Sequence, residues 1–155
     1  METTKQHYEG CTRAFRALAE AHTIIATEIE RALSYNFRLS LNEFDTLVCL
    51  DNQPQKSAPL SSLAQRIHLS QPAISRLVDR LDKRNLIAKI GCTEDKRSLT
   101  IQLTEEGCNL LVQAIPIHDQ CIREKLLKHL SHEENEILRL ALIRVIEENA
   151  AQTER

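Results

Sequence analysis

The chain has 155 residues, which suffice for one domain with a hydrophobic core but not for two ordinary domains. No stretch approaches the ~20 apolar residues of a membrane helix, and residues 1–10 lack a signal-peptide pattern, so we expect a cytoplasmic protein without a membrane partner. The five scattered cysteines favour reduced thiols over a disulfide framework. Three glycines and four prolines leave little room for turn-rich β structure, which predicts a mainly α (α+β) fold.

Charge is distributed unevenly along the chain. The formal net charge is −2, which taken alone argues against a nucleic-acid partner. Residues 66–97, however, carry eight Lys and Arg against four Asp and Glu, a local net charge of +4, and the remainder carries −6. A basic central segment between acidic flanks is typical of a surface that binds phosphates.

The first predicted helix, residues 8–33, carries a narrow apolar seam. The seam residues recur at alternating spacings of three and four: Phe15, Leu18, His22, Ile25, Ile29 and Ala32. Such a seam is typical of a helix that packs on a partner helix.

Capping signals define the next helices. Ser40 and Glu43 have the spacing of a capping box and predict the start of a second helix, which is followed by a loop at residues 53–59. Ser61 is predicted to cap a third helix that ends at Ile67. Ser70 is predicted to cap a fourth helix.

The third and fourth helices with their short turn predict a helix-turn-helix. His68 occupies the turn, where a positive φ is often needed, and Asn85 is placed to close the fourth helix in the left-handed conformation. Residues 86–90 and 99–103 then read as two strands of a hairpin with a charged tip. This hairpin would form a wing beside the helix-turn-helix.

Two further helices are predicted after the hairpin. Thr104 caps the fifth helix, which we expect Pro116 to kink rather than end. Ser131 and Glu134 form a second capping box, which opens a sixth helix ending near Asn149.

Four segments together resemble the multiple antibiotic resistance regulator (MarR) family. They are residues 60–67, 69–81, 95–98 and 103–107. The combination of the helix motif, Asp95-Lys96-Arg97-Ser98 and Leu103-Thr104-Glu105-Glu106-Gly107 is specific, whereas any one piece alone is weak.

The resemblance implies a winged helix-turn-helix regulator that binds double-stranded DNA at a pseudo-palindromic operator as a homodimer. We expect a repressor that is relieved by a small-molecule effector, with an activator as the alternative. The single domain, 1–155, would divide into dimerisation helices at 1–38 and 108–155 and a DNA-binding lobe at 39–107. Its first, fifth and sixth helices would interleave with those of a second copy.

Positions on the recognition helix and the wing predict the DNA contacts. Five residues at the start of that helix should reach base edges and nearby phosphates: Ser70, Gln71, Ala73, Ser75 and Arg76. Arg76 is the candidate for a bidentate pair with guanine. Four basic side chains should contact DNA phosphates: Arg66, Arg80, Lys83 and Arg84. Arg97 at the wing tip should enter the minor groove, oriented by Asp95. Lys96, beside it, is a further predicted DNA contact.

An effector site is expected where family members often bind small aromatic anions. The candidate residues are Arg13, Phe15, Arg16, His22, Tyr35 and Phe44. With five aromatics in the chain, the case for an aromatic rather than merely anionic ligand is thin, and core packing is the alternative for Phe15 and Phe44.

Three alternatives remain open at this stage. Cys11 on the first helix would fit a thiol-based redox regulator of the same fold, as in some family members, although an inert thiol is the simpler interpretation. A winged helix can also bind protein instead of DNA, but the basic recognition helix favours DNA. The paired His and Cys near 118–121 and 129–132 have ligand-like spacing but cannot meet along one helix, so we predict no metal, no cofactor and, without a catalytic motif, no enzyme.

Overall fold

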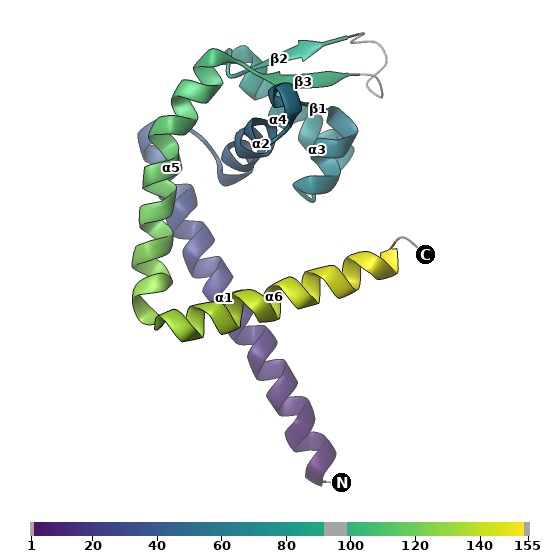
Figure 1. Cartoon of the computed structure of the whole chain (residues 1–155), viewed down its shortest axis with the longest axis vertical. Coiled ribbons are helices and arrows are strands. Elements are labelled where there is room, and N and C mark those ends of the chain that lie inside the picture. The colour runs from purple at the N-terminus through teal and green to yellow at the C-terminus, as the bar shows by residue number, and fades with distance from the viewer. Residues whose placement is uncertain (1, 92–98, 154–155) are drawn as a thin grey trace. The chain divides into compact units, whose positions relative to one another are not determined.

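The computed structural model describes the backbone of residues 2–91 and 99–153, and the side chains of residues 12–91 and 99–150 (Figure 1). Two compact units are present: one comprises residues 26–119, and the other joins residues 1–25 to residues 120–155. The elements follow in chain order: α1 (Glu2–Phe37), α2 (Leu41–Asp51), η1 (Pro54–Lys56), β1 (Ser57–Pro59), α3 (Leu60–Arg66), α4 (Gln71–Lys83), β2 (Ile87–Ile90), β3 (Thr100–Leu103), α5 (Glu105–Lys125), η2 (Leu127–His129) and α6 (His132–Thr153).

The unit of residues 26–119 combines α2, α3 and α4 with a three-stranded antiparallel sheet. The strand order is β1-β3-β2, with Ser57 opposite Gln102 and Ile87 opposite Leu103. β2 and β3 confirm the predicted hairpin. The prediction of a loop throughout 53–59 is wrong for β1, because three residues show no alternation of their own and only pairing with β3 makes them a strand.

The core of this unit draws on every predicted element around the helix-turn-helix. Its largest fully buried aliphatic side chains are Leu33, Leu39, Leu47, Leu50, Leu60, Leu63, Ile74, Leu81, Ile87, Ile101 and Val78. α4 contributes Ile74, Leu77, Val78 and Leu81 from one face and leaves its opposite face to solvent. The helix-turn-helix and the two wing strands are therefore confirmed as one packed lobe.

Local backbone signals explain the joints between these elements. The Ser40 capping box is confirmed: the Glu43 N–H donates to Ser40 Oγ over 3.2 Å, and the Ser40 N–H donates to Glu43 Oε2 over 2.9 Å. His68 and Asn85 adopt φ values of 55° and 56°, as predicted for the two turns. Thr104 also caps as predicted, since its Oγ1 accepts the Gly107 N–H over 3.0 Å.

Two predicted helix starts need correction. α3 begins at Leu60 and its N-cap is Pro59, two residues before the predicted cap Ser61. The Leu60 N–H donates to Leu99 O over 2.9 Å and so continues the pairing of β1 with the segment of β3. Ser70 does stand at the N-cap of α4, but its side chain makes no capping hydrogen bond.

The end helices are longer than predicted: α1 spans Glu2–Phe37 and α6 extends to Thr153. α5 runs through Pro116 without ending, as expected, and the second capping box at Ser131 is confirmed by both of its hydrogen bonds. None of the helices in the described part of the chain is long and apolar enough to cross a bilayer.

The unit of residues 1–25 and 120–155 exposes much of its apolar surface. A groove of about 440 Å³ is lined by small and aliphatic residues and one histidine: Ala14, Ala17, Leu18, Ala21, His22, Ile25, Leu126, Leu138 and Leu142. Outside the groove, Phe15 is 71% exposed and Ile146 67% exposed. Large exposed apolar patches on a protein usually mark a surface that binds a partner.

Candidate nucleic-acid interface

The recognition helix of the helix-turn-helix is α4, and its polar face carries most of the predicted contacts. Six predicted side chains are exposed on α4 and its flanks: Ser70, Gln71, Arg76, Arg80, Lys83 and Arg84. Arg66 at the end of α3 is exposed as well, whereas Ala73 and Ser75 are half-buried. Asp95, Lys96 and Arg97 lie outside the described residues. The structure thus brings the described candidates together on one helix-turn-helix.

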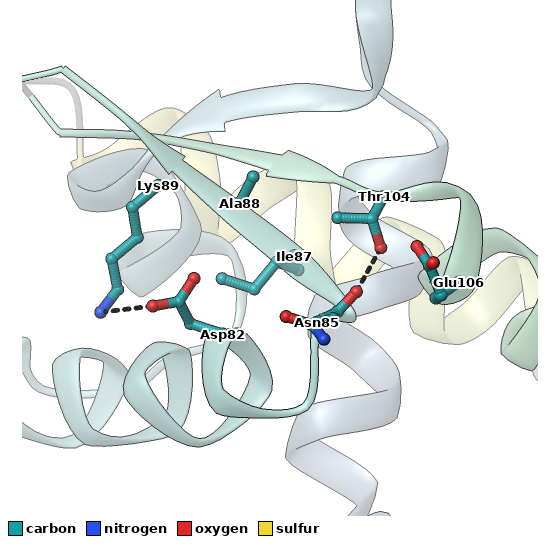
Figure 2. A pocket seen from close by; sticks show the side chains of 7 residues that line it. All are labelled: Asp82, Asn85, Ile87, Ala88, Lys89, Thr104 and Glu106. Carbon is teal, nitrogen blue, oxygen red and sulfur yellow. Dashed lines mark hydrogen bonds and ion pairs between the residues drawn. The ribbon is translucent and has the colours of Figure 1, made fainter.

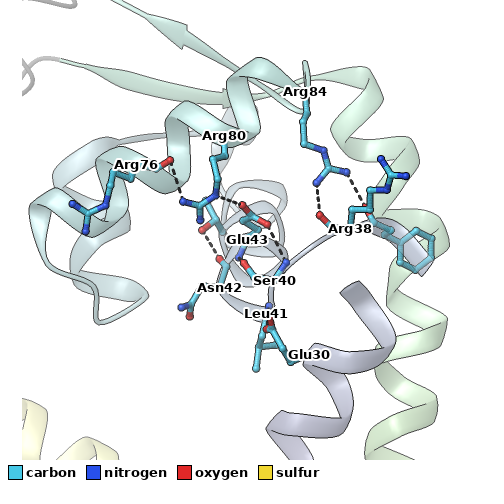
Figure 3. A network of polar contacts seen from close by, with 11 residues as sticks. Glu30, Arg38, Ser40, Leu41, Asn42, Glu43, Arg76, Arg80 and Arg84 are labelled. Atoms are coloured by element: carbon cyan, nitrogen blue, oxygen red, sulfur yellow. Dashed lines mark hydrogen bonds and ion pairs between the residues drawn. The ribbon is translucent and has the colours of Figure 1, made fainter. Parts of the chain in front are cut away.

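Three arginines, two on α4 and one at its C-cap, are spaced four residues apart, yet they have different surroundings. Within the described residues the Arg76 guanidinium makes no hydrogen bond or ion pair, and Figure 3 shows it directed away from Glu43. Arg80 Nε donates to Glu43 Oε1 over 2.8 Å. Arg84 donates through Nη1 to Arg38 O over 2.7 Å and through Nη2 to Phe37 O over 2.8 Å.

Sequence reasoning missed Glu43 as a partner of the recognition helix. Its side chain is only 8% exposed, and it belongs to the capping box of α2. The capping motif was a signal for one of its carboxylate oxygens, but nothing local indicated that the other oxygen would accept from Arg80, 37 residues further along the chain.

Glu43 is held in its ionised form. Burial opposes the charged carboxylate, but the Ser40 backbone N–H and the Arg80 guanidinium together outweigh burial and lower the pKa of Glu43. Because the folded-state pKa is depressed, the stabilisation is complete above the unfolded-state pKa and is lost as the pH falls through the folded-state value.

We expect Glu43→Gln to reduce stability near neutral pH, with a loss that shrinks as the pH falls below the ordinary glutamate pKa of about 4.3. The reason is that protonation removes the same charge from the wild type. Urea unfolding of both proteins between about pH 3 and pH 7, a range that spans the ordinary glutamate pKa, measures the difference in their free energies of unfolding. Glu147→Gln, at an exposed position of α6, serves as the control. A Glu43→Gln penalty that grew toward low pH would contradict the assignment.

The base of the wing is tied to the recognition helix by Lys89. Its Nζ lies 2.6 Å from Asp79 Oδ1 and 3.3 Å from Asp82 Oδ2, and both carboxylates are on α4. The hydrogen bond to Asp79 is the main cause of a raised Lys89 pKa; burial opposes it, and Asp82 adds to it. Lys89 and Asp82 line a pocket of about 650 Å³ (Figure 2). Thr104 and Asn85 line the same pocket, and Thr104 Oγ1 donates a hydrogen bond to Asn85 O over 2.6 Å. Lys89 therefore stays protonated, and its positive charge is balanced by two carboxylates of α4.

The predicted effector residues do not share one environment. Phe44 is 3% exposed and stacks on His118, with 4.8 Å between the ring centroids. Tyr35 is 87% exposed. Phe15, Arg13 and Arg16 are exposed on α1, and His22 lines the apolar groove.

The cysteines divide into three described thiols and two that are not described. Cys49 and Cys108 are half-buried and Cys121 is buried, and Lys56 Nζ lies 3.2 Å from Cys108 Sγ. The side chain of Cys11, the redox candidate, lies outside the described side chains. Among the described residues, no three His, Cys, Asp or Glu side chains are grouped to hold a metal ion.

A winged helix-turn-helix whose recognition helix presents a basic, solvent-exposed face defines a class of DNA-binding proteins. The model of the MarR family matches residues 39–99. The HTH-type transcriptional regulator PecS of Dickeya dadantii (strain 3937) is 32% identical over 122 residues, which cover 76% of this chain and 72% of PecS.

Solved structures agree with this match. AbsC, a MarR family transcriptional regulator from Streptomyces coelicolor, superposes with a TM-score of 0.79 at 26% identity, covering 90% of this chain and 94% of AbsC. Sco3205, a MarR family regulator of the same organism solved in complex with DNA, has a TM-score of 0.79 at 25% identity, covering 89% of this chain and 86% of its own.

The chain belongs to the MarR family of transcriptional regulators. Family membership confirms the resemblance, the winged helix-turn-helix fold and the prediction that the protein is a regulator and not an enzyme.

Proposed function

We propose that the protein is a homodimeric, sequence-specific repressor that binds a pseudo-palindromic operator in double-stranded DNA. The observation that carries the proposal is the exposed basic face of α4, where the Arg76 guanidinium has no hydrogen-bond or ion-pair partner among the described residues. Because α4 buries its apolar face in the lobe, the polar face is the only one it can offer to a partner.

The DNA contacts follow from position on this face. The start of α4, including Gln71 and Ser75, would meet base edges, and Arg66 and Lys83 would meet phosphates. From the wing, Arg97 would reach the minor groove with Asp95 orienting it, as proposed from the sequence.

A second copy of the chain is the proposed partner of the apolar surface. Phe15, Ile137 and Ile146 are each at least 60% exposed in the single chain, and all three belong to the unit of residues 1–25 and 120–155. Burying such surface against an identical one stabilises a twofold dimer, and a twofold dimer matches a palindromic site.

Relief of repression by a small anionic or aromatic effector belongs to the same proposal. Among the candidate effector residues, His22 is supported by its place in the apolar groove, where one polar side chain among aliphatic ones could orient a ligand. Arg13 and Arg16 are exposed on the same helix and could pair with an anion.

The test is selection of duplexes from a random library by the wild-type protein, followed by titration of the selected duplex and a scrambled one. We expect a palindromic consensus, two chains per selected duplex, and an affinity that falls with a log–log salt slope of about −0.9 per phosphate contacted. An affinity that stayed flat between low and high salt, or equal binding of both duplexes, would contradict sequence-specific DNA binding.

A further inference from the structure

The three arginines along α4 are equivalent in type and spacing but not in their contacts. Arg80 and Arg84 turn toward residues 37–43, the segment that joins α1 to α2 and opens α2, which we call the α1–α2 corner (Figure 3). Figure 3 shows the Arg76 side chain directed away from Glu43, and none of the hydrogen bonds marked there joins its guanidinium to this corner. The difference separates arginines that hold the helix from one that is free to bind DNA.

Arg84 satisfies the end of α1. The last carbonyls of a helix have no partner within it. Phe37 O, the last carbonyl of α1, and Arg38 O, the next one along the chain, each accept a hydrogen bond from Arg84. Arg38 itself has a φ of 53°, so the α-helical conformation of α1 does not continue through it. A guanidinium can bridge two carbonyls because its donors are fixed in a planar fork, whereas the single nitrogen of lysine cannot reproduce that fork.

Arg80 binds the C-terminal end of the α1–α2 corner, at Glu43. Its Nε donates to Glu43 Oε1, and the second oxygen of that buried carboxylate accepts the Ser40 N–H. Arg80 also reaches back to Arg76 O, over 3.5 Å. The guanidinium is thus engaged by a buried anion inside the lobe, and the α1–α2 corner is fastened to α4 at two points one helical turn apart.

We propose that Arg80 and Arg84 are positioning residues that set the orientation of the recognition helix, in place of the phosphate contacts that the sequence predicted for them. The proposal rests on the proposed DNA-binding function. Base-reading side chains must be held to within about 0.5 Å of their productive geometry, so a helix that is released at its C-terminal end loses sequence-specific contacts. Binding that depends on overall charge alone is unaffected.

The experiment uses the full-length protein and two substitutions at neighbouring positions. Arg84→Lys keeps the charge but cannot bridge both carbonyls, and Lys83→Met removes a charge that is exposed on the same turn of α4. Affinity is measured for the selected duplex and for the scrambled duplex over a salt series, at a temperature where circular dichroism shows each variant folded. Arg80→Lys repeats the test at the second point of attachment.

We expect Arg84→Lys to weaken binding of the selected duplex by about 10-fold and to leave the scrambled duplex and the salt slope unchanged. Lys83→Met should weaken both duplexes alike and reduce the magnitude of the slope by about 0.9. A ratio of the two affinities that stayed at the wild-type value in Arg84→Lys and Arg80→Lys would overturn the proposal, even if the melting temperature fell.

A phosphate-contact role has a different signature. Arg84→Met would then reduce the salt slope as Lys83→Met does, and this result would also overturn the proposal. The wild-type titrations run beside the variants test the proposed function separately, because a wild type that did not distinguish the two duplexes would contradict DNA reading itself and not only the assignment of the arginines.

Discussion

Gly107→Ala is expected to destabilise the protein strongly, although the change adds a single methyl group. A Cβ placed on Gly107 would lie 2.2 Å from Leu86 O and 2.6 Å from Leu103 Cδ1. Leu86 O is a backbone atom that accepts the Thr104 N–H over 3.2 Å. It cannot move aside without breaking this hydrogen bond, which joins the residue before β2 to the residue before α5. Gly107 is needed here because of the space it leaves free.

The expected cost is about 1–3 kcal/mol or more, the range for overpacking a filled site. Urea unfolding of wild type and variant at equal protein concentration measures it as a shift of the midpoint at constant m. Asn109→Ala, on an exposed position of the same helix, should stay within about 0.5 kcal/mol of the wild type. If Gly107→Ala were equally neutral, the close packing of α5 on Leu86 would be wrong.

Arg76→Ala is expected to remove the preference for guanine at one base position in each half-site. Arg76 lies in the N-terminal half of α4, and its guanidinium has no hydrogen-bond or ion-pair partner among the described residues. An arginine at such a position can form a bidentate pair with guanine O6 and N7. The loss should be about 1–3 kcal/mol, which corresponds to about 5- to 150-fold in affinity for the selected duplex.

The measurement is a binding-site selection with each variant, compared base by base with the wild type. Lys83→Ala provides the contrast, because an exposed lysine that meets a phosphate supplies affinity but no sequence preference. Its profile should match that of the wild type at lower overall affinity. A profile for Arg76→Ala that kept every base preference would show that another side chain reads the guanine.

The sequence alone determined the features whose causes lie within a few residues of one another. The Ser40 capping box needs only Glu43, three positions away, and the turns at His68 and Asn85 need only residues that tolerate a positive φ. The spacing of apolar and basic residues along α4 likewise predicts its buried face and its basic face. These signals were sufficient for the helix-turn-helix and the wing strands.

Tertiary structure alone decided features that depend on partners far away in the chain. β1 exists because residues 57–59 meet residues 100–102, and no local pattern marks them as a strand. Arg76, Arg80 and Arg84 are indistinguishable by spacing, but only the latter two find Glu43 and the end of α1 within reach. The charge of Lys89 counts toward a basic segment until the fold pairs it with two carboxylates. In each case folding brings a hydrogen-bond partner or an opposite charge to the residue, and the geometry of that approach is set by packing of the whole lobe and not by the neighbouring sequence.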